Sequence, residues 1–153
     1  MWVPPEVTDP IVYQAPTRKS VALFGAVNIR TGKLITMFTP IFDAETFEAF
    51  LRMLARHLSR TRPARLIVDN ARYHHAELLQ PFLKSYADRF LLDFLPPYSP
   101  QLNPIERVWK FLRKKATHNV YFPTLEELVD VVSREAIELS KPNEELRSLC
   151  HIS

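Results

Sequence analysis

One stretch decides the fold: Phe94-Leu95-Pro96-Pro97-Tyr98-Ser99-Pro100-Gln101-Leu102-Asn103-Pro104-Ile105-Glu106-Arg107-Val108-Trp109. Its middle contains too many prolines for a helix or a strand. Its end predicts a helix start, because Pro104 suits the first helical position and Asn103 is a common cap. Glu106 follows Asn103 by three residues, as in a capping box. The stretch therefore predicts a rigid elbow that holds Glu106 at a helix start, either as part of the cap or as a site residue.

A second carboxylate follows a short apolar run. Residues 66–68 are continuously apolar, which is typical of a strand buried on both faces, and Asp69 comes next. A helical pattern over 75–86, interrupted by a proline, then precedes a second strand-like run over 90–95. Strand, helix and strand predict a parallel crossover unit. Because α/β sheets bind ligands at the carboxyl ends of their strands, we expect Asp69 and Glu106 at the same edge.

The remaining segments predict a hairpin and two more helices. Residues 20–29 and 34–39 are β-branched and aromatic runs joined by a turn that contains Gly32, which predicts an antiparallel hairpin. Asp43 suits the cap of the next helix, and Thr124 opens a second capping box before a last helix. A hairpin that leads into a parallel unit predicts an α/β fold, with a mixed sheet and flanking helices.

The composition is that of one soluble domain. The chain has 153 residues, of which 46% are hydrophobic, and its single cysteine excludes an internal disulfide and a cysteine-built zinc site. We expect an irregular, proline-rich lead-in over 1–19 and a single domain over 20–153. No segment has the pattern of a membrane span or a signal peptide, so we expect no membrane association and a cytoplasmic location.

The charged residues are segregated along the chain. Basic residues outnumber acidic ones in two segments, 52–72 and 101–120, whereas 121–147 is mainly acidic. Asp69 is the only acidic residue of the first basic segment, and Glu106 is the only one of the second. This distribution favours a polyanion such as nucleic acid on the side of the two carboxylates, although a basic run on a helix also fits a solvated face.

These residues together resemble a known family. The run Val68-Asp69-Asn70-Ala71-Arg72-Tyr73-His74 and the elbow with its following Leu102-Asn103-Pro104-Ile105-Glu106-Arg107-Val108-Trp109 resemble the second and third catalytic blocks of DDE-superfamily transposases. The mariner-like group, which includes many bacterial insertion sequences, is the most similar. The hairpin residues Phe24-Gly25-Ala26-Val27-Asn28 also resemble the ribonuclease H-like domain of that family. The resemblance covers nearly the whole chain.

The resemblance implies DNA transposition by two-metal chemistry. Asp69 and Glu106 would bind Mg²⁺ or Mn²⁺, which hold the attacking and leaving oxygens during phosphodiester cleavage and strand transfer. DNA, as transposon ends and target, is the implied partner, and a bacterial, nucleoid-associated location follows. The residues implied to contact DNA are Asn70, Arg72, His74, Tyr98, Lys110, Arg113 and Lys114.

The chain departs from the family pattern in one respect. The family uses a third carboxylate, an aspartate on its first strand, and no strand expected here carries one. Glu6 and Asp9 stand among prolines, and Asp43 is explained as a helix cap. We therefore expect that the first strand and the family's helix-turn-helix part are missing and that the chain alone is inactive. A second polypeptide or an upstream frame would supply them, and a homodimer is a further possible partner.

Other interpretations stay open or are excluded. The sequence has only two glycines and no phosphate-binding glycine loop, which argues against a nucleotide-hydrolysing protein. A non-catalytic DNA-binding or assembly remnant of a transposase is the alternative function. Asp93 either faces solvent at a sheet edge or faces the site. The neighbouring His74 and His75 are expected to point apart, and Trp109 is expected in the core.

Overall fold

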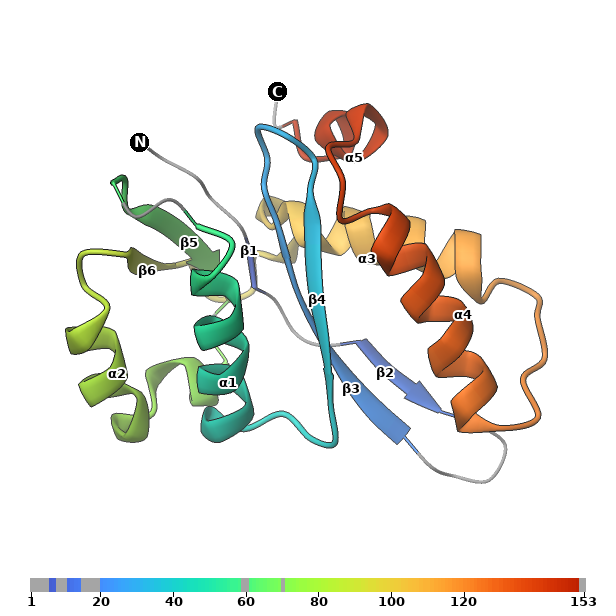
Figure 1. Cartoon of the computed structure of the whole chain (residues 1–153), viewed down its shortest axis with the longest axis horizontal. Coiled ribbons are helices and arrows are strands. Elements are labelled where there is room, and N and C mark those ends of the chain that lie inside the picture. Colours follow the sequence, from blue (N-terminus) through green and yellow to red (C-terminus); the bar gives the residue numbers. More distant parts are fainter. Residues whose placement is uncertain (1–5, 8–10, 15–19, 59–60, 70, 152–153) are drawn as a thin grey trace.

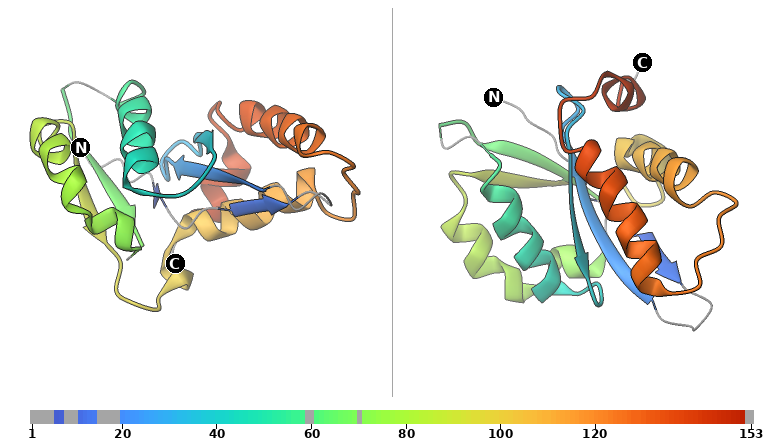
Figure 2. Two further views of the ribbon diagram at one scale, coloured as in Figure 1. Left: turned by 90° about the horizontal axis from the view of Figure 1, so that it is seen from below. Right: turned by 45° about the vertical axis from the view of Figure 1, so that its right-hand side comes forward.

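The computed structural model describes residues 6–7, 11–14, 20–58, 61–69 and 71–151. Within these ranges the strands form two three-stranded sheets, with the orders β2-β3-β4 and β1-β5-β6. Helices cover the strands on two sides (Figures 1 and 2). No helix of the described part is long and apolar enough to cross a bilayer. The fold is the predicted α/β arrangement of antiparallel and parallel strands.

The antiparallel sheet contains the predicted hairpin. β3 (Ser20–Val27) pairs with β4 (Leu34–Thr39) across a turn in which Gly32 has a φ of 76°. This backbone conformation suits glycine, because a side chain there would meet the backbone at Asn143. β2 (Ile11–Gln14) pairs with the other edge of β3. The hairpin prediction is therefore confirmed.

The parallel sheet contains the strand that precedes Asp69. β5 (Ala64–Val68) lies between β1 (Glu6–Val7) and β6 (Phe90–Phe94), and both pairings are parallel. The crossover from β5 to β6 holds two short 3-10 helices, η1 (Arg72–His75) and η2 (Glu77–Leu79), and helix α2 (Gln80–Ser85). The predicted interruption of the helical pattern is confirmed, because Pro81 lies in the first turn of α2.

The prediction that residues 1–19 are wholly irregular is wrong. The described residues of this segment form β1 and β2, and β1 is parallel to β5. The sequence pattern missed them because each strand is too short to show an alternation of apolar and polar residues. The edges of β5 and β3 would otherwise leave backbone N–H and C=O groups unpaired. Pairing with these edges forms strands from residues that have little intrinsic preference for strand conformation. Asp9 lies outside the described residues.

Four further helices complete the fold. They are α1 (Ala44–Ala55), α3 (Pro104–Ala116), α4 (Leu125–Glu138) and the short α5 (Glu144–Leu149), which the sequence had not predicted. One apolar cluster joins β3 and β4 to α3, α4 and α5, and a second joins α1 to β5, β6 and α2. The two clusters lie on opposite sides of the strands.

Trp109 fixes α3 on the sheet. Its side chain is fully buried, as predicted, and its ring lies against Gly25 of β3. A Cβ atom at Gly25 would overlap this ring. The glycine therefore permits close approach of the helix, and this contact sets where Glu106, one turn earlier on α3, can lie.

Candidate active site

Asp69 directly follows β5, the central strand of the parallel sheet. Its Oδ1 accepts a hydrogen bond of 3.0 Å from the backbone N–H of Ala71 and lies 3.0 Å from Nδ1 of His74. The same Nδ1 lies 2.9 Å from the backbone oxygen of Asp69. Because both neighbours of Nδ1 are acceptors, we assign its proton there. These contacts orient a carboxylate whose side chain is 23% exposed.

His74 is buried behind the Asp69 carboxylate. It is 1% exposed, and its ring packs 4.5 Å from the ring of Phe47, measured between centroids. The expected phosphate contact of His74 stays a prediction, and the burial of the side chain counts against it. The neighbouring His75 is exposed and stacks on Phe94. The two histidines point apart, as predicted.

The elbow between β6 and α3 forms the second wall of the site. The backbone N–H of Leu95 donates to the carbonyl of Val68 at 2.8 Å, so the elbow starts beside the end of β5. Tyr98 has a φ of 58° and is 99% exposed. A positive φ at a residue with a side chain stores strain, which the surrounding prolines and η3 (Pro100–Leu102) hold in place. The predicted rigid elbow is present.

The start of α3 differs from the expected capping box. Asn103 is 2% exposed, and its side chain caps no helical N–H. Its Oδ1 accepts no hydrogen bond from any residue within the described ranges. The contact between Glu106 and Asn103 is only backbone to backbone, at 3.1 Å. Asn103 therefore occupies the predicted N-cap position of α3, but the predicted side-chain cap and capping box are wrong. The side chains of Asn103 and Glu106 remain available to the site.

Asp69, Asn103 and Glu106 line one cavity of about 350 Å³, together with Tyr98. Partial burial raises the pKa of Glu106 above its usual range, the charge of Arg113 lowers it, and the Asp69 carboxylate raises it again. The two carboxylates therefore lie close enough to repel each other. Such a pair at a strand end is suited to a divalent cation.

The described residues of the cavity do not form a complete metal site by themselves. No group of three or more histidine, cysteine or acidic side chains in the described ranges is placed to bind a metal ion. The described residues that fit a hard cation are the carboxylates of Asp69 and Glu106. Asn103 carries no sequence signal that assigns it to the site, because its position before Pro104 is also that of an ordinary helix cap.

A basic stripe runs along α3 from the cavity. Lys110, Arg113 and Lys114 are exposed and follow Glu106 by four, seven and eight residues, so they lie on the same side of the helix. The effect of Arg113 on the pKa of Glu106 is consistent with this placement. Arg107 is not part of the stripe, because its guanidinium donates to the backbone oxygen of Leu149 at 2.8 Å.

The remaining residues in question are Arg72, Asn70 and Asp93. Arg72 is exposed in η1, three residues after Asp69, and Asn70 lies outside the described residues. Asp93 forms a surface ion pair of 3.1 Å with Arg65 on the neighbouring strand β5. Asp93 is absent from the residues that line the carboxylate cavity, which answers the question of its direction.

Comparison with known proteins identifies the family. The family model described as DDE superfamily endonuclease matches residues 1–129. The chain belongs to this family. The DDE chain is 37% identical over 107 residues to an uncharacterized protein, y4pE/y4sA, of Sinorhizobium fredii (strain NBRC 101917 / NGR234), covering 70% of this chain and 76% of that protein.

Two further matches cover a larger share of the DDE chain than of the matched protein. It is 30% identical over 120 residues to an uncharacterized 39 kDa protein of insertion element IS630 from Shigella sonnei; the match covers 78% of this chain but only 34% of that protein. The solved catalytic domain of Mos1 transposase with Raltegravir and Mn has a similar fold, with a TM-score of 0.68 and 18% identity over 95% of this chain and 77% of that one. The predicted ribonuclease H-like fold is confirmed.

Proposed function

We propose that this chain is a transposase catalytic domain that cleaves and joins DNA strands with divalent metal ions once a third carboxylate completes its site. The observation that carries the proposal is the shared cavity of Asp69 and Glu106, which come from a strand end and a helix start. The family match supports phosphodiester chemistry, and the relationship to an insertion-element protein supports DNA as the substrate.

Mg²⁺ or Mn²⁺ fits the residues of the cavity. Carboxylate oxygens are hard ligands, and Asp69 and Glu106 would hold a cation whose charge would offset their repulsion. When bound, two such ions hold the attacking and leaving oxygens of an in-line displacement at phosphorus. The similar Mos1 catalytic domain was solved with Mn, which supports this choice of metal. Ala71 and His74 would keep the Asp69 carboxylate oriented for binding.

DNA would lie along the exposed basic stripe of α3. Lys110, Arg113 and Lys114 would neutralise backbone phosphates without reading sequence, which makes binding weaker as the salt concentration rises. Arg72 would add a contact beside Asp69. The exposed ring of Tyr98 at the mouth of the cavity offers a surface on which an unpaired base can stack.

A third carboxylate would complete the site. The parallel pairing of β1 with β5 brings the carboxyl end of β1 to the sheet edge that holds Asp69. Glu6 lies in β1, and Asp9 follows it in the sequence outside the described residues. We propose that the third ligand comes from this end of the chain or from a second polypeptide, and the variants Glu6→Gln and Asp9→Asn distinguish the two sources.

The test combines metal binding with DNA nicking. We expect Mn²⁺ binding, measured by calorimetry, to be lost in Asp69→Asn and Glu106→Gln. It should persist in Asp93→Asn, a matched control whose carboxylate is on the surface. Nicking of a supercoiled plasmid with Mg²⁺ or Mn²⁺, absent from Asp69→Asn, supports catalysis by this cavity.

A second candidate function is DNA binding or assembly without catalysis. The observation that favours it is that, within the described ranges, no group of three or more histidine, cysteine or acidic side chains is placed to hold a metal ion. In that case the chain binds DNA in a salt-sensitive way and shows no metal-dependent nicking. Unchanged Mn²⁺ binding in both carboxylate variants would contradict the metal site itself.

A further inference from the structure

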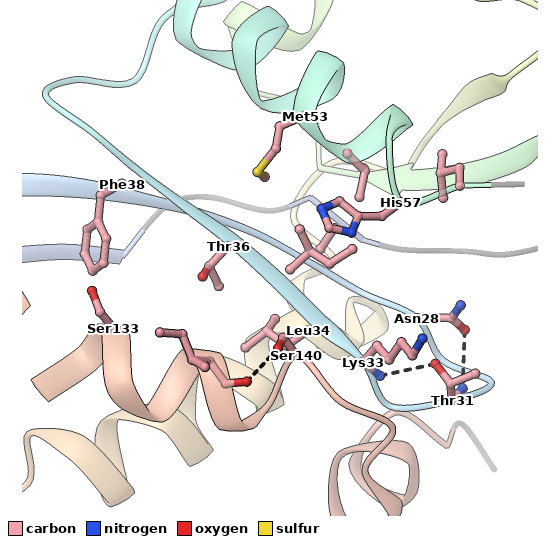
Figure 3. Close-up of a pocket in the computed structure, with 16 residues that line it drawn as sticks. Asn28, Thr31, Lys33, Leu34, Thr36, Phe38, Met53, His57, Ser133 and Ser140 are labelled. Atoms are coloured by element: carbon pink, nitrogen blue, oxygen red, sulfur yellow. Dashed lines mark hydrogen bonds between the residues drawn. The ribbon is translucent and has the colours of Figure 1, made fainter. Parts of the chain in front are cut away.

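A second cavity lies beside β4, away from the carboxylates. It has a volume of about 530 Å³ and lies between α1 and α4, on either side of β4 (Figure 1). Figure 3 shows Met53 of α1 and His57, just after that helix, on one side, and Ser133 of α4 and Ser140, just after that helix, on the other. Thr36 of β4 lies between them. We call this cavity the β4 groove.

The hydrogen-bonding pattern of β4 leaves backbone groups open to the β4 groove. Asn28 donates its N–H to the carbonyl of Lys33 at 2.9 Å, so these two residues form a hydrogen-bonded pair. From this pair on, hydrogen-bonded and non-hydrogen-bonded pairs alternate along β3 and β4. Ile35 and Met37 therefore bond to β3, whereas the alternate residues Leu34, Thr36 and Phe38 direct their backbone groups outward. The N–H of Leu34 confirms this direction, because it donates to Leu139 at the end of α4 at 2.8 Å.

Thr36 and Phe38 are the outward residues without such a partner. Among the described residues, no hydrogen bond reaches the backbone N–H or C=O of either one. Both residues line the β4 groove. Exposed strand edges of this kind pair readily with another extended chain, and proteins usually block them with charge, proline or a covering segment. This edge has none of these over Thr36 and Phe38 in the described ranges.

The side chains of the groove set the chemistry of a partner. Its walls are largely apolar, with Met53, Leu54 and the 62% exposed Ile137 among them. One end carries Lys33 and His57, and Figure 3 shows both at the side of the groove near Asn28. Neither makes an ion pair with a residue in the described ranges. The groove thus offers apolar contacts along its length and positive charge at one end.

We propose that the β4 groove binds an extended peptide segment of a partner protein as an additional strand on β4. Main-chain bonds to Thr36 and Phe38 would hold the segment, and apolar side chains at alternate positions would fill the walls. An acidic residue would lie near Lys33 and His57. About six residues suffice, because β4 is six residues long and a strand rises about 3.3 Å per residue.

A separate segment fits this edge better than a second copy of the chain. The edge lies between α1 and α4, which line the groove on its two sides. A second copy would bring its own α1 and α4 against the same two helices, whereas an isolated strand carries no such helices. The inference does not rest on the proposed catalytic function, because none of the groove residues belongs to the carboxylate cavity.

Hydrogen exchange with a synthetic peptide tests the proposal. The probe is a six-residue peptide of alternating valine and threonine with one terminal glutamate, blocked at both ends. At a concentration ten times its Kd, exchange of the Thr36 and Phe38 amides should slow about tenfold. The amides of Ile35 and Met37 already bond to β3, so their exchange should change little and they serve as internal controls.

One change to the peptide and two changes to the protein keep the test decisive. N-methylation of the peptide nitrogens that face β4 should abolish the protection, whereas methylation of the alternate nitrogens should leave it. Thr36→Pro removes an outward N–H without removing a bond to β3, so the variant should lose peptide binding. Lys33→Glu should weaken binding of the glutamate peptide about fivefold or more and favour a lysine-ended peptide.

Three results would overturn the proposal. The first is an absence of binding at millimolar peptide by the wild-type chain. The second is binding that leaves the exchange of Thr36 and Phe38 unchanged, which would indicate an apolar ligand site. The third is protection of these amides that depends on protein concentration without peptide, which would make a second copy the occupant.

Discussion

Helices α1 and α3 begin with similar sequence patterns and differ in what their first residues do. At α1 the Asp43 side chain accepts from the N–H of Thr46 at 2.8 Å, and the Thr46 hydroxyl accepts from the N–H of Asp43 at 3.0 Å. At α3 the Asn103 side chain is buried without a cap bond, and Glu106 lines the carboxylate cavity. One helix uses its polar residues for its own stability, and the other leaves them to the site.

At the start of α3, packing takes the place of a side-chain cap bond. The start of α3 is secured by its buried face, with Ile105, Val108 and Trp109 fully inaccessible, and by Pro104 in its first turn. Tertiary packing supplies most helix stability in proteins, so a helix with a strong apolar face can do without a cap. The predictions below test this division of roles.

The largest expected effect is loss of the Trp109 side chain. Trp109→Ala leaves a cavity between α3 and β3 and should lower the free energy of unfolding by about 3–5 kcal/mol. Urea denaturation measures it, and Phe111→Ala, a partly buried position on the same helix, is the control with a smaller loss. A loss below that of Phe111→Ala would show that α3 is held by something other than this contact.

Filling the space at Gly25 should have the next largest effect. The Cβ of Gly25→Ala overlaps the Trp109 ring, so the free energy of unfolding should fall by about 1–3 kcal/mol. The double variant Gly25→Ala with Trp109→Leu should recover part of this loss, because the smaller side chain leaves room. Strictly additive losses in this cycle would contradict direct contact as the cause.

Removing the two cap-position side chains should give unequal losses. Asp43→Ala should cost about 1 kcal/mol, the usual value of a cap. Asn103→Ala should change stability little, because its buried oxygen has no bond to lose within the described residues. It should instead lower the Mn²⁺ affinity about tenfold, because the Asn103 side chain lines the cavity of the two carboxylates and can support a ligand there. Equal stability losses would restore the cap interpretation of Asn103.

The smallest expected effect is a dependence of stability on pH. The pKa of Glu106 is raised in the folded chain, so the native state binds more protons than the unfolded state between the unfolded and folded pKa values. Its contribution to stability is therefore full below the unfolded pKa and is lost as the pH rises through the folded pKa. Glu106→Gln should lack this decline.

The measurement compares Tm values of the two proteins across that pH range. The variant should gain relative to wild type as the pH rises, and Mn²⁺ should reduce the difference by stabilising only the wild type. Glu126→Gln, in the first turn of α4, is the control for loss of a glutamate at a helix start. A constant difference at all pH values would contradict the raised pKa of Glu106, which burial causes first and the Asp69 carboxylate adds to.

Much of the fold followed from local patterns. The hairpin around Gly32, the buried strand before Asp69, the strand before the elbow and the start of α3 at Pro104 all occur as predicted. β1 and β2 did not follow, because their pairing with β5 and β3 decides their conformation. Helix α5 was missed because six residues are too few to show a helical period.

The site was predictable in its residues and less so in their roles. Asp69 and Glu106 were found from the strand end and the helix start, and the cavity brings them together. The burial of His74 was not predictable, because neighbouring histidines carry no signal of which one turns inward. The surface position of Asp93, where it pairs with Arg65, was not predictable for a similar reason. Side chains alternate between the two faces of a strand, but the sequence does not show which face meets solvent.

By itself, the sequence determined the elements and the order in which they occur, because turns, prolines and apolar periods act over a few residues. It also determined which carboxylates end beside the sheet. Only the tertiary structure decided whether a polar side chain at a helix start serves the helix or the cavity. The reason is that Asp43 and Asn103 have the same local preference, and only packing against β3 determines that α3 is held without its cap.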